Sequence, residues 1–141
     1  MLLIRIARYV WAAPCSMVGL LAATLAFVFG GSIRGKRGVL EVSLAAGTPL
    51  AFPGLKFAFE AITLGHVIIG RTEQGLERLR LHELEHVRQY EQWGLLFFLA
   101  YPLSSLWQLM RGRNPYWDNY FEIQARERSA MKARGPDGRC G

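Results

Sequence analysis

The chain has 141 residues, enough for one domain with its own hydrophobic core. Its hydrophobic fraction of 51% is higher than in most soluble domains of this size, and its formal net charge is +6. The basic residues are dispersed, and several flank apolar segments, which favours membrane lipid over nucleic acid as the partner of this charge. We therefore expect a membrane-associated protein that does not bind nucleic acid.

The first long segment is apolar, because no charge occurs between Arg8 and Arg34. As a helix with a rise of about 1.5 Å per residue it is long enough to cross a hydrocarbon core of roughly 30 Å. We predict that residues 1–34 form an N-terminal membrane anchor. A cleaved secretory signal is the alternative, since Arg5 precedes the apolar stretch and LAATLA offers small residues for cleavage. The stretch exceeds the roughly 7 to 15 apolar residues of a signal, which favours the anchor.

The next segment predicts a small antiparallel sheet. The glycines and charges of GSIRGKRG indicate a loop, and the alternation in GVLEVSL indicates a strand. LKFAFEAITLGHVIIGR, punctuated by Gly65 and Gly70, indicates two more strands or one bent strand. A helix then runs from Thr72, a good N-cap, to Gly94, a good C-terminal glycine.

A second uncharged stretch, residues 92–110, is interrupted by Pro102, which predicts a kink or an end of the helix. We expect a broken apolar hairpin or an in-plane helix that dips into the bilayer and returns. A buried pair of core helices is the alternative. Three aromatic residues of this stretch suit a membrane interface: Trp93, Tyr101 and Trp107.

A last helix, NYFEIQARERSAMKAR, is predicted after a turn-rich loop, with Asp118 as its N-cap. The predicted fold class is α+β: an N-terminal membrane helix, a small antiparallel sheet, the helix that contains HELEH, a broken apolar hairpin and a C-terminal helix that carries Glu122. The domain itself would span residues 35–134, and the polar residues 135–141 would form a flexible tail.

The stretch HELEH fits the zinc-peptidase signature H-E-x-x-H and also its mirror, H-x-x-E-H. On a helical wheel, Glu83 falls among apolar residues and Glu85 falls among polar ones. An acid held in an apolar setting beside a metal has the raised proton affinity that a general base needs. We therefore predict that His82 and His86 bind a metal and that Glu83 is the catalytic base.

The same wheel predicts that Glu85 is a surface residue that pairs with Arg78 or Arg88. A charged amphipathic helix that contains two histidines by chance is the alternative interpretation of the whole motif. Ionisable groups on the apolar side of a helix are costly to bury without a metal or partners, and this favours the metal site.

A catalytic zinc site uses three protein ligands and a water, so two histidines leave it one ligand short. Glu91 lies about 140° round the helix from His86 and cannot reach the same metal. A lone histidine on a predicted strand, such as His66, is more often a packed residue or a group that orients a ligand. The residue types allow five candidates: His66, Glu91, Asp118, Glu122 and Glu127.

The combination HELEH…EIQA resembles the gluzincin zinc metallopeptidases, especially small and membrane-bound members whose ligand helix reads E-x-x-A-D. The resemblance covers roughly residues 62–131. It implies Zn²⁺ bound by His82, His86 and Glu122, with Glu83 activating a water for peptide-bond hydrolysis. It also implies that a strand near HVIIG lines the cleft and pairs with an extended peptide or protein substrate.

One residue departs from the family pattern. Arg126 stands where the pattern has an aspartate that orients a ligand histidine, and Glu127 or a backbone carbonyl would have to take over that role. A zinc-binding membrane scaffold without hydrolysis is therefore the runner-up to a metallopeptidase. A basic membrane-surface protein without metal is a third interpretation.

The predicted site also constrains the topology, because residues 92–110 lie between the histidine pair and Glu122. A single crossing of the bilayer by this stretch would place the two halves of the site on opposite sides. The site therefore predicts that the stretch begins and ends on the same side. We expect that side to be cytoplasmic, although the positive charges on either side of the N-terminal segment are nearly balanced.

Overall fold

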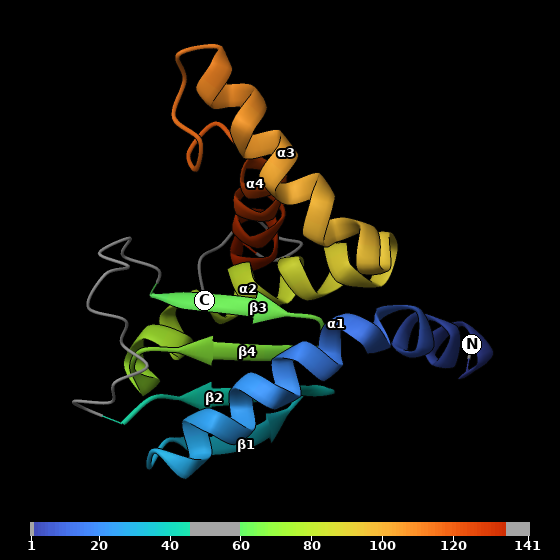
Figure 1. Cartoon of the computed structure of the whole chain (residues 1–141), viewed down its shortest axis with the longest axis vertical. Coiled ribbons are helices and arrows are strands. Elements are labelled where there is room, and N and C mark those ends of the chain that lie inside the picture. Colours follow the sequence, from blue (N-terminus) through green and yellow to red (C-terminus); the bar gives the residue numbers. More distant parts are fainter. Residues whose placement is uncertain (1, 46–59, 135–141) are drawn as a thin grey trace.

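The computed structural model describes residues 2–45 and 60–134 and has the predicted α+β class. The predicted tail, residues 135–141, lies outside the described residues. Figure 1 shows the elements, which in chain order are α1 (Leu2–Val28), β1 (Ser32–Lys36), β2 (Val39–Ser43), β3 (Ala61–Leu64), β4 (Val67–Gly70), α2 (Glu73–Trp93), the short 3₁₀ turn η1 (Gly94–Leu96), α3 (Phe97–Met110) and α4 (Tyr120–Arg134).

The four strands form one sheet in the order β1-β2-β4-β3. Its two hairpins, β1–β2 and β3–β4, are antiparallel, but β2 and β4 pair in parallel, with Leu40 opposite Val67 and Val42 opposite Ile69. The sheet is therefore mixed, and the prediction of a purely antiparallel sheet is wrong for its central pairing. Alternating hydrophobicity marks a strand, but it does not set the direction of a neighbour that is distant in sequence.

The predicted loop GSIRGKRG contains strand β1, whose five residues are all exposed. A two-residue turn joins β1 to β2, because Lys36 lies opposite Val39. Both turn residues have positive φ, 53° at Arg37 and 81° at Gly38, as the favoured two-residue hairpin turns require. The charges of this segment thus belong to an exposed edge strand, which is why its pattern resembles a loop.

Helices α1 and α2 cover opposite faces of the sheet, so the core has three layers (Figure 1). Strand residues alternate between the two layers with a period of two. Val42 and Val67 pack with Ala23 and Ala26 of α1. On the other face, buried strand residues pack with buried residues of α2 in a cluster made of Val39, Ile68, Leu76 and Val87.

Helix α1 packs inward through small residues at a spacing of three or four. Gly19, Ala23 and Ala26 face the sheet, whereas Ala12 and Cys15 pack with Tyr90, Phe97 and Phe121. The approach is close, because a Cβ added at Gly19 would lie 2.6 Å from the carbonyl oxygen of Leu64. Among the described residues, two helical stretches are long and apolar enough to cross a membrane: α1 and the stretch from Glu73 to Met110. The buried side of α1 belongs to the core, and β1 includes residue 34.

The ends of α2 lie where the sequence predicts them. The Oγ1 atom of Thr72 accepts a hydrogen bond from the backbone N–H of Gly75 at 3.0 Å, and Gly94, with φ of 54°, ends the helix. Helix α3 runs from Phe97 to Met110 through Pro102, so of the two outcomes predicted for Pro102, a kink or an end of the helix, the end is wrong. A proline removes one backbone hydrogen bond but has a helical φ, and the chain changes direction at Gly94 instead.

The N-cap of α4 is Asn119 rather than the predicted Asp118. Its Oδ1 atom accepts a hydrogen bond from the N–H of Phe121 at 2.9 Å, and its carbonyl accepts the first helical bond, from Ile123. Asp118 instead accepts a hydrogen bond from the N–H of Asn114 in the preceding turn. Both residue types cap helices well, so only the geometry of this turn decides between them.

Candidate metal centre

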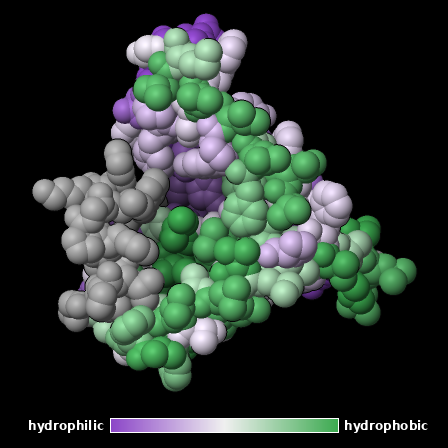
Figure 2. All heavy atoms as spheres, viewed as in Figure 1, coloured by the Kyte–Doolittle hydropathy of each residue, from purple (hydrophilic) through white to green (hydrophobic). Residues whose placement is uncertain are grey.

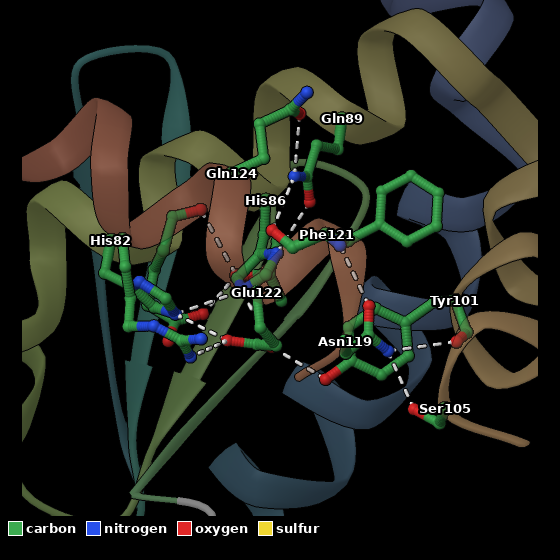
Figure 3. A network of polar contacts seen from close by, with 12 residues as sticks. His82, His86, Gln89, Tyr101, Ser105, Asn119, Phe121, Glu122 and Gln124 are labelled. Carbon is green, nitrogen blue, oxygen red and sulfur yellow. Dashed lines mark hydrogen bonds and ion pairs between the residues drawn. The ribbon is translucent and has the colours of Figure 1, made fainter. Parts of the chain in front are cut away.

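Three side chains from two helices converge on one point. His82 and His86 lie one turn apart on α2, and Glu122 lies in the first turn of α4 (Figure 3). The Nε2 atoms of the two histidines are 3.1 Å apart, and the two carboxylate oxygens of Glu122 lie 3.2 Å from Nε2 of His82 and 3.2 Å from Nε2 of His86. Among the described residues, these three form the only group of histidine, cysteine or acidic side chains with metal-ligand geometry.

The spacing of the two histidine nitrogens fits a tetrahedral zinc site. Two ligand atoms bonded to zinc at about 2.0–2.1 Å with a tetrahedral angle lie about 3.3 Å apart. The two Nε2 atoms, 3.1 Å apart, are within about 0.2 Å of that value, and each carboxylate oxygen of Glu122 lies 3.2 Å from one of the two histidines. Two imidazoles and one carboxylate also match the ligand set of catalytic zinc sites, in which a water takes the fourth position.

Glu122 is a buried anion. Burial by itself raises the pKa of its carboxyl, but hydrogen bonds from His82 and His86 outweigh burial and hold the pKa well below its ordinary value. Tyr101 on α3 donates a further hydrogen bond to its Oε1 atom at 2.7 Å. The pKa of His86 is raised: burial lowers it, but hydrogen bonding to Glu122 and the Coulombic attraction of that carboxylate overcome burial.

Gln89, which lies outside the HELEH motif, holds one histidine of the converging group in place. Nδ1 of His86 donates a hydrogen bond to Oε1 of Gln89 at 2.8 Å, so the ring presents Nε2 to Glu122. Gln89 is itself fixed, because its Nε2 atom donates to the carbonyl of Phe121 at 2.9 Å. Gln89 follows His86 by three residues on the same helix, and this spacing is the signal that would have identified it.

Helix α3 is joined to the start of α4 by a separate polar contact (Figure 3). The Nδ2 atom of Asn119 donates to the carbonyl oxygen of Tyr101 at 3.1 Å and to Oγ of Ser105 at 2.7 Å. The same residue that caps α4 therefore also positions the tyrosine that bonds to Glu122. Helix α3 leads away from the site, and residues 111–119 return the chain to the start of α4, where the backbone N–H of Tyr120 donates to Oγ of Ser104 at 3.1 Å (Figure 1). That both ends of residues 92–110 lie on the same side of a bilayer stays a prediction.

Glu83 lies beside the three converging side chains, in the wall of a cavity of about 260 Å³. Its side chain is buried, with 4% of the residue exposed, and Thr63 on β3 donates a hydrogen bond to its Oε2 atom at 2.7 Å. The cavity is formed by β3, α2, α3 and Tyr116 in the loop before α4. Burial and the nearby carboxylates of Glu122 and Glu83 raise the pKa of Tyr116 to about 12, so its phenol remains a hydrogen-bond donor at neutral pH.

The prediction for Glu85 is confirmed for its partner and wrong for its exposure to solvent. It pairs with Arg88 at 3.0 Å, one of the two expected arginines, but only 1% of the residue is exposed. The helical wheel placed it toward solvent because its neighbours on α2 are polar, and α4 packs over that side of α2 and brings Lys132 onto the carboxylate. A single helix carries no information on which of its faces another helix will cover.

The remaining predicted residues lie elsewhere. Nδ1 of His66 is 3.0 Å from Oγ of Ser16, its ring stacks on Tyr9, and its Nε2 atom is 3.5 Å from Oε1 of Glu91. His66 therefore lies between α1 and α2, and it belongs neither to the converging group nor to the cavity wall.

On α4, Arg126 lies 3.9 Å from Oε2 of Glu122, and its guanidinium group stacks over Trp117. Glu127 is exposed. Neither residue orients a ligand histidine, and the contact that the family pattern assigns to an aspartate is made to His86 by Gln89.

The strand that lines the cavity is β3, not the strand HVIIG. Strand β4, which contains most of HVIIG, is inside the sheet between β2 and β3. All four residues of β3 line the cavity, and β3 forms an edge of the sheet. The correction follows from the parallel pairing of β2 and β4, which places the first strand of the second hairpin outermost.

Comparison of the chain with known protein families, with curated proteins and with solved structures finds no match.

Proposed function

We propose that this protein is a membrane-associated zinc metallopeptidase. The observation that carries the proposal is the convergence of His82, His86 and Glu122, whose ligand atoms lie within 4.8 Å of one another, in the wall of a cavity that also contains the buried carboxylate of Glu83. A catalytic zinc site needs three protein ligands, a position open to a cavity and an acid within reach of that position. The common position of His82, Glu83, His86 and Glu122 in the wall of one cavity supports such a site.

His82, His86 and Glu122 would hold Zn²⁺, which supplies a Lewis acid and lowers the pKa of a bound water toward about 7. Glu83 accepts a proton from the attacking water as its oxygen bonds to the peptide carbonyl carbon. Because Thr63 donates to Oε2, the proton is accepted at Oε1. Glu83 then returns this proton to the amine nitrogen as the C–N bond breaks.

Strand β3 supports a peptide or protein as the substrate. It forms an edge of the described sheet and runs along the cavity, so a peptide in extended conformation can add to it as a further strand. Backbone hydrogen bonds would fix such a peptide with its carbonyl groups at regular spacing beside Glu83. Side chains that alternate toward the cavity would then contribute selectivity.

The membrane assignment rests on the apolar character and length of α1. We propose that α1 is retained as an anchor rather than removed as a signal, because its small residues are part of the core and Cys15 and Ala12 are fully buried. A cytoplasmic position of the catalytic domain stays a prediction, which the nearly balanced flanking charges do not decide.

A zinc-binding scaffold without hydrolysis is the second candidate. Arg126 favours it, because a guanidinium group 3.9 Å from Oε2 of Glu122 competes with a metal for that carboxylate. Both the metallopeptidase and the scaffold would contain zinc, but only the metallopeptidase would hydrolyse peptides.

The proposed function is tested by measuring metal content and hydrolysis of a quenched peptide library on the same preparation of the full chain in nanodiscs. We expect about one zinc per chain and turnover that is lost with a chelator and restored by added zinc. Bound zinc without turnover of any library member would support the scaffold, and absence of zinc would reject both candidates.

A further inference from the structure

On helix α3 the polar side faces the rest of the protein and the apolar side faces outward. A surface helix of a soluble protein has the opposite arrangement. The side that faces α4 carries Tyr101, Ser104 and Ser105, each of which makes a hydrogen bond to α4 or to its cap. The outward side carries large apolar residues that are 50–73% exposed: Leu99, Leu103, Leu106, Trp107 and Met110. In water the apolar side of a surface helix faces the core, so this helix is built for an apolar surrounding on its outer side.

Helix α1 has the same kind of outer surface. Its inner side consists of small residues packed on the sheet, and large apolar residues are exposed on its outer side, among them Leu21, Leu25 and Phe27. Figure 2 shows the hydrophobic side chains of α1 and α3 on one face of the molecule. A polar hollow opens on this face, where the cavity lies between β3, α2 and α3.

The packing of α1 argues against a simple perpendicular span. From Gly19 to Ala26 one side of α1 lies on the sheet, and the sheet ends in β1, an exposed strand with basic side chains. An open sheet edge does not occur within hydrocarbon, because its backbone groups would lack hydrogen-bond partners. A helix fixed to such a sheet fits the surface of a bilayer, with its outer side in the lipid.

Basic residues lie at the ends of both apolar helices. Arg111 and Arg113 follow the end of α3, and Arg5 and Arg8 lie in the first turns of α1. Arginines at the borders of an apolar surface match the phosphates of anionic lipid, while the apolar side chains match the acyl chains. This combination favours a lipid bilayer, rather than a second copy of the chain, as the partner of this surface. The arginines of a second copy would repel the arginines of the first.

We propose that the outer sides of α1 and α3 bind flat to the surface of an anionic bilayer, and that the cavity cleaves extended apolar segments held at that surface. The substrate part rests on the proposed peptidase function. Helix α3 links the two parts, because its outer side would face lipid while Phe97, Phe98 and Pro102 form the apolar wall of the cavity. A polypeptide segment at the bilayer surface therefore reaches the cavity without passing through water.

The first part is tested with nitroxide spin labels on the full chain in nanodiscs that contain anionic lipid. The labels are placed at Leu103→Cys and, as a matched control on the charged side of α4, at Glu127→Cys. Both are made in a background that carries Cys140→Ser, which removes the second cysteine. Cys15 is kept, because it is fully buried and inaccessible to the label. We expect the label at 103 to collide mainly with oxygen dissolved in lipid and the label at 127 mainly with an aqueous nickel complex. Exposure of both labels to the aqueous complex, or spin–spin broadening at 103 from a second copy, would overturn the bilayer assignment.

The substrate assignment is tested with two forms of one quenched peptide, which has a large apolar residue on either side of the scissile bond. One form is soluble and the other is acylated at its amino terminus and held in the same nanodisc. We expect the acylated form to be cleaved at least about tenfold faster, because confinement to the surface raises its effective concentration. Equal rates for both forms would overturn the substrate assignment. Cleavage of neither form with zinc bound would reject the peptidase function itself, and the spin-label result would still decide the bilayer assignment.

Discussion

Glu83 and Glu85 lie two residues apart on α2, and both are buried, but they face different surroundings. The carboxylate of Glu83 lines the cavity and accepts a hydrogen bond from Thr63 on β3. The carboxylate of Glu85 pairs with Lys132 on α4 and with Arg88 on its own helix. One acid of the HELEH motif is therefore available for chemistry, and the other joins two helices.

The first prediction concerns the stability of the α2–α4 contact. Glu85→Gln leaves Lys132 and Arg88 without their buried counter-charge, so we expect the free energy of unfolding to fall by about 1–3 kcal/mol. Zinc content should not change, because Glu85 lies outside the converging group. Urea unfolding of the purified variant measures the loss. The exposed Glu127→Gln is the control and should stay within about 0.5 kcal/mol of the parent chain.

The second prediction concerns the ligand set. His82→Ala, His86→Ala and Glu122→Ala should each strongly reduce the zinc content of the purified protein, because a site with three protein ligands loses much of its affinity with any one of them. Elemental analysis of each variant gives the number of zinc ions per chain. His66→Ala is the control and should keep its zinc, because His66 lies between α1 and α2. Full zinc content in Glu122→Ala would remove Glu122 from the site.

The third prediction concerns the orientation of His86. Gln89→Leu removes the oxygen that accepts a hydrogen bond from Nδ1 of His86, so we expect zinc affinity to fall by about 10- to 100-fold. Competition with a fluorescent chelator measures the affinity. Gln89→Glu keeps an acceptor oxygen at that position and should retain most of the affinity. Equal losses in both variants would mean that Gln89 acts only through its contact with the carbonyl of Phe121.

The fourth prediction tests whether α1 is part of the fold. A methyl group at Gly19 would lie 2.6 Å from the carbonyl oxygen of Leu64 and 2.7 Å from Cβ of Val67. Gly19→Ala should therefore destabilise the protein by about 1–3 kcal/mol, although alanine is the better helix former. Gly35→Ala is the matched control, because no atom lies within 4 Å of the added methyl. A fully stable Gly19→Ala protein would show that α1 does not pack on the sheet and would favour a removable signal.

Much of the fold could be predicted from patterns that are local in sequence. Thr72 and Gly94 bound α2 because capping depends on a few neighbouring residues, and the apolar length of α1 is visible directly. The structure differs where a contact distant in sequence decides. Nothing near β2 indicates that β4 will pair with it in parallel, and nothing on α2 indicates that Lys132 will reach Glu85.

The candidate site, too, could be predicted only where its pattern is local in sequence. The spacing of His82 and His86 sets their side chains on one face of α2, and this could be predicted from the helical repeat. Glu122 could be proposed only through the resemblance, because its distance from the histidines depends on the path of α3. Tyr101 and Thr63 carry no motif, and only the folded chain places them on Glu122 and Glu83.

The most direct test of the proposed function is the rate of hydrolysis of the peptide library by Glu83→Gln and Glu85→Gln at equal zinc content. Glu83→Gln keeps the shape of the side chain but cannot accept a proton, so we expect full zinc and a rate lower by a factor on the order of 10² or more. Glu85→Gln should retain most of the parent rate at a temperature where it is folded. If Glu85→Gln is the inactive variant and Glu83→Gln is active, the assignment of Glu83 as the base is wrong. If neither substitution changes the rate, hydrolysis does not use this site.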